Sequence, residues 1–214
     1  MNLYLVRHGK TDAELYKRRQ APDSPLGKEG KSNVRKLGTQ LSKSKFDLIL
    51  TSHWKRALET SLIISKKLNI PYEIVEGIHE RVYPQEVHGS LIESEINQQF
   101  NKELEENFFN LDWKYLGKGE SLRETRQRAE RFKEKILNNY PEKNIIVVTH
   151  GIFLRCFIAE CLLPKECEDQ TYIKLFHSFS LGNAGITKLE YNSQKDLWKI
   201  NYLNYNLEKG KFTL

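Results

Sequence analysis

Two histidines follow apolar segments in the same local pattern, and each is succeeded by a glycine. The segments read LVRHG at residues 5–9 and VVTHG at residues 147–151. In an open parallel sheet, ligands bind beyond the carboxyl ends of the strands. We therefore expect His8 and His150 to share one crevice. Arg7 directly precedes the first histidine, and Arg56 follows a third apolar segment, so two guanidinium groups are expected at the same edge.

Two imidazoles and two guanidinium groups form a set that suits a phosphoryl group. Arginine offers planar, bidentate donors that match phosphate oxygens and stay charged at every working pH. A neutral imidazole can act as a nucleophile, and a second can donate to the group in transfer. Phosphoryl transfer needs mainly positioning and stabilisation of charge. The sequence has no clustered carboxylates and no cysteine–histidine spacing typical of a metal site, so we predict no metal and no cofactor.

The elements that must position these groups alternate along the chain. Apolar runs at residues 3–6, 46–50 and 145–149 predict buried strands, and each is followed by polar residues. Apolar residues at helical spacing follow the first two runs, and residues 152–163 are apolar nearly all round, as in a buried helix. This alternation predicts an α/β fold, a three-layer α/β/α sandwich around a mostly parallel central sheet.

The rest of the chain adds a helix, two strands and an irregular region. Residues 121–124 fit a capping box, which predicts a helix that starts at Ser121. Residues 186–191 and 197–203 predict two further strands. Residues from about 82 to 120 break the alternation and hold aromatic residues among many polar ones. We interpret this region as an insertion over the active-site edge of the sheet, within a single domain that spans residues 1–214.

Six segments, in order along most of the chain, resemble motifs of the histidine phosphatase superfamily, in its phosphoglycerate-mutase-like branch. Residues 7–11 (RHGKT) are similar to the RHGxT signature, and residues 52–60 (SHWKRALET) resemble the SxxxRAxxT segment. One such match is weak, whereas six in the family's order are specific. The other four are residues 23–30, 78–81, 119–121 and 148–151, which resemble the DxPLTxxG, LxER, GES and VxHG motifs.

The resemblance implies a role for each matched residue. His8 would be the nucleophile that attacks phosphorus and becomes a phosphohistidine. Arg7, Arg56 and His150 would hold the phosphate oxygens, and His150 would thereby belong to the catalytic set. Glu80 would protonate the leaving oxygen and then activate the water that hydrolyses the phosphoenzyme. An alkoxide leaves poorly without a proton, and a carboxyl of raised pKa can supply one. The family needs no metal and no organic cofactor for this reaction.

Several residues depart from the family's pattern. Glu14 stands where the family often has asparagine, Lys10 replaces a commoner glutamate or glutamine, and Gly27 replaces the usual threonine. These departures concern the phosphate pocket and the choice of substrate. The acid-bearing segment is also less regular than the others, and the rivals of Glu80 are Glu76, Glu86 and Glu93.

We predict a metal-independent phosphatase that acts on a small phosphorylated metabolite. Mutase-type phosphotransfer is the nearest alternative; the pair Glu80-Arg81 favours it, but residues 82–120 contain no arginine for a second phosphate clamp. A phosphoprotein phosphatase is another alternative, against which the insertion argues. The net charge of +6 also fits a nonenzymatic protein that binds anions or nucleic acid, although no nucleic-acid-binding module is recognisable.

Composition sets the remaining expectations. A hydrophobic fraction of 39% in 214 residues is enough for a core and excludes general disorder. The three cysteines fit neither a disulfide framework nor a zinc site, which favours a reducing compartment. No apolar run is long enough to cross a membrane, and the N-terminus does not resemble a signal peptide. We expect a cytoplasmic protein without a membrane or nucleic-acid partner, and the sequence leaves a homodimer open.

Overall fold

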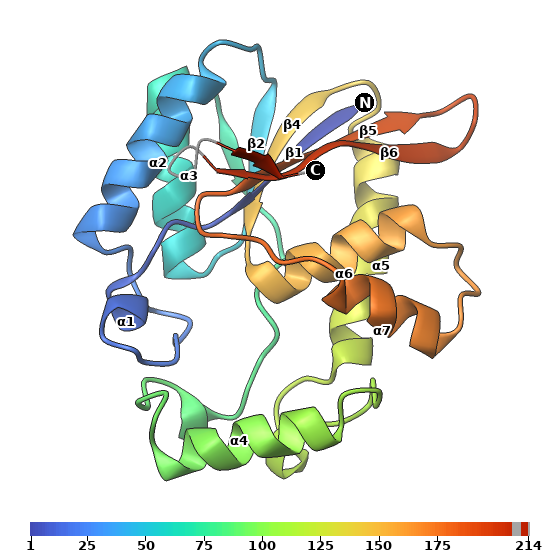
Figure 1. Ribbon diagram of the computed structural model, residues 1–214. Helices are drawn as coiled ribbons and strands as arrows, with labels where there is room; N and C mark the ends of the chain where they lie inside the picture. The colour runs from blue at the N-terminus through green and yellow to red at the C-terminus, as the bar shows by residue number, and fades with distance from the viewer. Residues whose placement is uncertain (207–210, 214) are drawn as a thin grey trace.

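A computed structural model describes residues 1–206 and 211–213 of the chain (Figure 1). Strands and helices alternate over its first half, as the sequence predicts. The strands are β1 (Asn2–Arg7), β2 (Leu48–Thr51), β3 (Tyr72–Ile74), β4 (Asn144–Thr149), β5 (Ile186–Asn192), β6 (Leu197–Asn206) and β7 (Lys211–Thr213). The α-helices are α1 (Asp12–Leu15), α2 (Lys28–Leu41), α3 (Lys55–Leu68), α4 (Glu95–Glu106), α5 (Leu122–Asn139), α6 (Gly151–Leu162) and α7 (Asp169–His177).

The strands form one mixed sheet in the order β3-β2-β4-β1-β5-β6-β7. The first four strands in this order are parallel, and β5, β6 and β7 join antiparallel. The α/β fold is therefore confirmed, and its parallel part contains the three strands that the site requires. Strands β5 and β6 pair antiparallel because the polar turn at residues 192–197 joins them directly, without a crossover helix.

Alternation of side chains along the central strands divides the core into two layers. Leu3 and Leu5 of β1 pack in one hydrophobic cluster with residues of α5, α6 and α7. Val6, on the opposite face of the same strand, packs with residues of α2 and α3. Figure 1 shows α2 and α3 on one side of the sheet and α5, α6 and α7 on the other. The three-layer sandwich follows from this two-residue period.

The predicted helix start at Ser121 is confirmed in detail. The Ser121 side chain accepts a hydrogen bond from the Glu124 amide, and the Glu124 carboxylate accepts one from the Ser121 amide. This capping box satisfies amides that the first turn of α5 leaves without helical partners. Helix α6 is buried on most sides, also as predicted. No described helix is both long and apolar enough to cross a membrane.

Residues 82–120 fold into α4 and two short 3-10 helices around a small core of their own. Phe100, Val87 and Tyr115 are buried together there, with Tyr83 and Trp113 packed against them. In Figure 1, α4 (green) lies apart from the two layers that flank the sheet, on the side of α1. The assignment of this segment as an insertion within one domain stays a prediction, but its position over one end of the sheet is clear.

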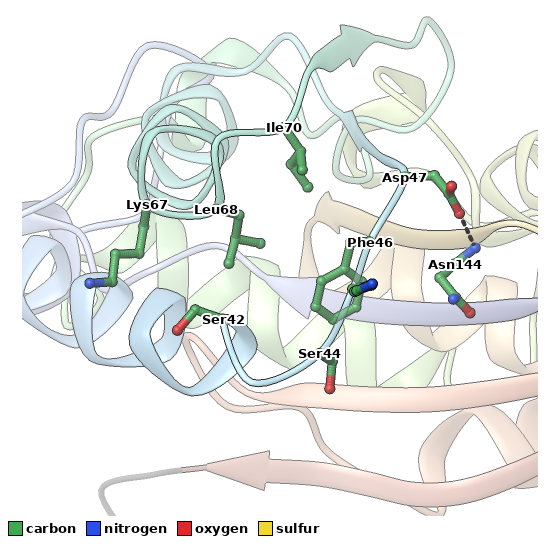
Figure 2. A pocket seen from close by; sticks show the side chains of 9 residues that line it. Ser42, Ser44, Phe46, Asp47, Lys67, Leu68, Ile70 and Asn144 are labelled. Carbon is green, nitrogen blue, oxygen red and sulfur yellow. Dashed lines mark hydrogen bonds between the residues drawn. The ribbon is translucent and has the colours of Figure 1, made fainter.

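A hollow of about 400 Å³ lies at the opposite end of the sheet (Figure 2). Its wall comes from the segment before β2, from the end of α3 and from the first residue of β4. Asp47 accepts a hydrogen bond from the Asn144 amide there, at 2.8 Å. This hollow therefore lies at the amino ends of the strands, whereas both histidines of interest follow carboxyl ends.

Candidate active site

The two strand–His–Gly segments meet at one edge of the sheet. Strands β1 and β4 are parallel neighbours with Arg7 opposite Thr149, so His8 and His150 each follow a paired position. Their ring centroids are 5.2 Å apart, and both side chains are buried. The expectation that the two imidazoles share one crevice thus agrees with the geometry.

Arg56 reaches the same place from the first turn of α3, after β2. Its Nε donates a hydrogen bond to Nε2 of His8 at 3.1 Å, and its Nη1 donates to the Ala21 carbonyl at 2.9 Å. The Arg56 side chain is only 1% exposed. Burial lowers the pKa of Arg56 to about 10, partly offset by Glu80 and Glu14, so the guanidinium is still charged at neutral pH.

The partners of His8 assign its proton to one ring nitrogen. Nδ1 lies 2.8 Å from the Gly9 carbonyl, which can only accept a hydrogen bond, so Nδ1 carries the proton. Nε2 receives a bond from Arg56, which can only donate, so Nε2 presents a lone pair. Burial, and next the charges of Arg56 and Arg7, hold the pKa of His8 well below its usual range. His8 is therefore a neutral imidazole with Nε2 free of a proton.

Two buried donor atoms beside His8 lack a hydrogen-bond partner within the described chain: Arg7 Nε and His150 Nδ1. The other nitrogens of these side chains are held. Arg7 donates to the Leu181 carbonyl at 2.7 Å, and Nε2 of His150 lies 2.9 Å from the Ser52 hydroxyl. A buried polar atom without a partner costs free energy, so native structures rarely keep one that no ligand or water satisfies.

Glu80 lies in the loop after β3 and caps the start of α6. Its carboxylate accepts hydrogen bonds from the amides of Ile152 and Phe153, each at 3.1 Å. These amides belong to the first turn of a helix, which attracts negative charge. The Arg81 amide donates to the same carboxylate at 3.0 Å. Glu80 is therefore held in one orientation, immediately beyond His150.

The loop that carries Glu80 is itself fastened by α5. Arg128 donates to the carbonyls of Gly77 and His79, and it pairs with the Glu120 carboxylate at 2.6 Å. Glu120 belongs to the segment that resembles GES and directly precedes Ser121, the N-cap of α5. Its carboxylate supports the acid-bearing loop through Arg128.

The rivals of Glu80 lie elsewhere. Glu76 is 86% exposed, Glu86 pairs with Lys118, and Glu93 pairs with Lys17. A different acid does enter the site. Glu14 accepts a hydrogen bond from Nη2 of Arg7 at 3.2 Å.

Helix α1 holds this second carboxylate in place. Thr11 caps the helix, and Glu14 accepts a hydrogen bond from the Thr11 amide at 2.9 Å in a second capping box. The Asn183 amide group donates to the same carboxylate at 3.3 Å. The position where the family often has asparagine thus carries a fixed negative charge beside the candidate phosphate ligands.

A cavity of about 320 Å³ is lined by Arg7, Arg56, Glu14 and Glu80 but by neither of the two buried histidines. Four arginines and two glutamates contribute to its wall. The sequence did not single out several of the lining residues, because they become neighbours only when the insertion folds over the sheet. The lining consists of Arg7, Glu14, Arg19, Gln20, Trp54, Arg56, Glu80, Arg81, Tyr83, His88, Ile92 and Ile152.

Arg19 joins the insertion to the loop after β1. It donates to the side-chain oxygens of Asn97 and Asn101 on α4, and its guanidinium lies 4.1 Å from the centre of the Phe100 ring. A run of basic residues such as 17–19 usually indicates a solvated surface, but Arg19 instead fastens α4 over the cavity. Within residues 1–206 and 211–213, no group of three or more histidine, cysteine, aspartate or glutamate side chains could hold a metal ion.

Comparison with known proteins identifies the family of this chain. The family model described as "Histidine phosphatase superfamily (branch 1)" matches residues 3–206. The chain belongs to this superfamily. It is 29% identical to the uncharacterized phosphatase PhoE of Bacillus subtilis, over 97% of this chain and 96% of that one. It is 30% identical to the adenosylcobalamin/alpha-ribazole phosphatase of Escherichia coli, over 78% of this chain and 82% of that one.

Solved structures of other proteins share the fold of this histidine phosphatase. A protein described as mycobacterial hydrolase 1 superposes with a TM-score of 0.81, at 20% identity, over 96% of this chain and 98% of that one. The superfamily and its close relatives are phosphatases, so this chain is a phosphoric monoester hydrolase. The relative from Escherichia coli is named for a small phosphorylated substrate.

Proposed function

We propose that this protein hydrolyses a small phosphorylated metabolite, without metal, through a phosphohistidine on His8. The observation that carries the proposal is the state of His8, a buried neutral imidazole with a lone pair on Nε2. Its chain neighbour Arg7, and His150 with its ring 5.2 Å away, each have one buried nitrogen without a partner among the described residues. A phosphate ester placed there would bring its phosphorus to Nε2. Its oxygens would then satisfy Arg7 Nε and His150 Nδ1.

In the first step, Nε2 of His8 attacks phosphorus and the bond to the ester oxygen breaks. Arg56 moves its hydrogen bond from Nε2 to a phosphate oxygen, beside those bound by Arg7 and His150. The Ser52 hydroxyl donates to Nε2 of His150, which leaves the proton on Nδ1 for the phosphate. This step requires Glu80 to enter it with a proton, which it gives to the leaving oxygen, so the product departs as an alcohol.

In the second step, water hydrolyses the phosphoenzyme. Glu80, now a carboxylate, takes a proton from the water, whose oxygen attacks phosphorus. The bond between phosphorus and Nε2 breaks, orthophosphate leaves, and His8 and Glu80 return to their starting protonation states. The guanidinium groups supply the charge stabilisation that this transfer needs.

The insertion supports a small substrate over a phosphoprotein, because Arg19 holds α4 over the cavity. Mutase-type transfer, the absence of nucleic-acid binding and a homodimer stay predictions, whereas a nonenzymatic role does not fit a phosphoric monoester hydrolase. Mutase activity is tested by 3-phosphoglycerate with a bisphosphoglycerate primer.

The deciding experiment measures phosphate release from an aryl phosphate in the presence of EDTA. We expect turnover by the wild type and its loss in His8→Ala, while His53→Ala, which changes an exposed histidine, retains turnover. Quenching turnover with alkali, in which the bond between phosphorus and the imidazole nitrogen survives, should trap phosphate on the wild type and on His53→Ala but not on His8→Ala. A folded wild type that gains activity only with added metal would refute the mechanism.

A further inference from the structure

A third histidine enters the candidate site from the insertion. Of the six histidines in the sequence, all of which lie in the described part of the chain, only His88 lines the cavity of about 320 Å³. Its imidazole is half-buried and forms no hydrogen bond or ion pair with another described residue. Neither step of the proposed hydrolysis uses this ring.

Both neighbours of His88 in the chain hold its backbone in place. Val87 is fully buried in the small core of the insertion. The Gly89 amide donates to the Arg19 carbonyl at 3.0 Å, and the Arg18 guanidinium donates to the Gly89 carbonyl at 2.7 Å. The loop after β1 therefore fixes the segment that carries the imidazole, and the ring keeps its place at the cavity wall.

Charges from three elements act on the ring. Arg56 extends from the first turn of α3, Asp23 lies in the loop before α2, and Glu86 lies in the short 3-10 helix that precedes His88. Burial, and next the charge of Arg56, lower the pKa of His88, while Asp23 and Glu86 act in the opposite direction. In this environment the imidazole is neutral at pH 7. The other charged groups of the cavity wall are Arg7, Glu14, Arg19, Glu80 and Arg81.

A phosphate bound to Arg56 would reverse this balance of charges. Its negative charge offsets the guanidinium and favours the protonated form of a nearby imidazole. The imidazolium can then donate a charge-assisted hydrogen bond to a phosphate oxygen. Because His88 has no other hydrogen-bond partner among the described residues, it needs to give up no bond to do so.

We propose that His88 binds the phosphate of the substrate as an imidazolium and takes up a proton from solvent as the phosphate enters. This role rests on the proposed function and adds a ligand from the insertion to those at the edge of the sheet. Phosphate affinity should increase as the pH is lowered from the pKa of His88 in the complex to its pKa in the free protein, by at most about tenfold per pH unit. Below that interval the proton is present before binding, so the contribution of His88 to affinity is constant.

Calorimetric titration with orthophosphate in EDTA tests this role without requiring turnover. The dissociation constant of His88→Asn should exceed that of the wild type roughly tenfold at pH 6 and should differ little from it at pH 8.5. The second ionisation of orthophosphate and the titration of His8 and His150 are common to both proteins and cancel in this ratio. Titrations in two buffers of different ionisation enthalpy should show that the wild type takes up more protons per bound phosphate than His88→Asn.

Two further variants make the test specific. Lysine keeps its charge over this pH range, so His88→Lys should bind phosphate more tightly than His88→Asn at pH 8.5. His53 is exposed, lies beside Glu76 and is not part of the cavity wall, so His53→Asn should match the wild type at every pH. A ratio between His88→Asn and wild type that stays constant from pH 6 to pH 8.5 would indicate a merely structural role and overturn the inference.

Binding of orthophosphate also separates this inference from the proposed function. Binding that depends on His88 and on pH, without hydrolysis of any ester, would refute the proposed function and retain His88 as a phosphate ligand. Hydrolysis that depends on His8, with a constant binding ratio, would retain the proposed function and refute the role of His88. A folded wild type that binds no orthophosphate at any pH would overturn the inference outright.

Discussion

Replacing Glu14 with glutamine should strengthen phosphate binding. Glu14 pairs with Arg7 at 3.2 Å and lines the cavity in which the phosphate is proposed to bind. Its charge repels that phosphate and occupies one nitrogen of the guanidinium. Glutamine preserves the shape of the side chain and can serve at this position of a capping box. The substitution therefore removes a charge while the start of α1 is retained.

The size of the effect follows from Coulomb's law. With a phosphate roughly 6 Å from Glu14, across the Arg7 guanidinium, and an effective dielectric constant of about 20, each pair of unit charges repels by roughly 3 kcal/mol. Both side chains are 25% exposed, so solvent screens part of this repulsion. We expect a net gain of about 1–1.5 kcal/mol, which corresponds to roughly tenfold tighter binding.

The assay is competitive inhibition of aryl phosphate hydrolysis by orthophosphate. The inhibition constant should fall about tenfold in Glu14→Gln. Glu124→Gln is a matched control, because Glu124 has the same position in the capping box of α5 and pairs with Lys114 instead. An inhibition constant that is unchanged or higher in Glu14→Gln, with the control equal to wild type, would refute the electrostatic reasoning.

Three more predictions concern the acid, the histidines and the insertion. Glu80→Gln should slow hydrolysis of an alkyl phosphate by roughly 10²–10⁴-fold. It should leave a burst of phenol from an aryl phosphate, because that leaving group needs no proton. An equal loss of both activities would contradict the role of Glu80 as proton donor. Burial lowers the pKa of His8 and His150, so below about pH 6.5 the unfolded chain binds more protons than the folded chain. The free energy of unfolding should therefore decrease as the pH is lowered, by up to about 1.4 kcal/mol per pH unit for each histidine. Urea unfolding at pH 7.5 and 5.5 checks this slope, and His8→Asn should remove one share of it. Arg19→Met should speed hydrogen exchange in α4 and raise KM, and unchanged exchange would show that Arg19 does not fasten the insertion.

Local patterns were sufficient for the residues that follow strands. His8 and His150 directly follow apolar runs, and Arg56 lies in the first turn of the helix that follows a third apolar run. The parallel pairing of the three strands therefore brings these residues together. The capping box at Ser121 is equally local, since its two hydrogen bonds join residues three apart. Helix α7 was not predicted, because its nine residues give too few turns for a clear apolar period.

Pairings between distant segments could not be predicted in this way. Arg19 contacts α4 about eighty residues later, and no periodicity of the intervening chain specifies that contact. Glu120 and Arg128 lie eight residues apart, a spacing that predicts no helix-surface pair, yet in the structure Arg128 binds Glu120 and the carbonyls of residues 77 and 79. Such contacts depend on how the insertion folds over the sheet.

The N-terminus of α6 links the candidate acid to the second histidine. The sequence places Glu80 and His150 in separate motifs seventy residues apart, and nothing in either motif indicates contact. In the structure, His150 is the N-cap residue of α6, and Glu80 accepts hydrogen bonds from the amides of Ile152 and Phe153 in the first turn of the same helix. One helix end thus orients both groups relative to β4. A substitution that shifts this turn of α6 would therefore displace the phosphate ligand and the proton donor together.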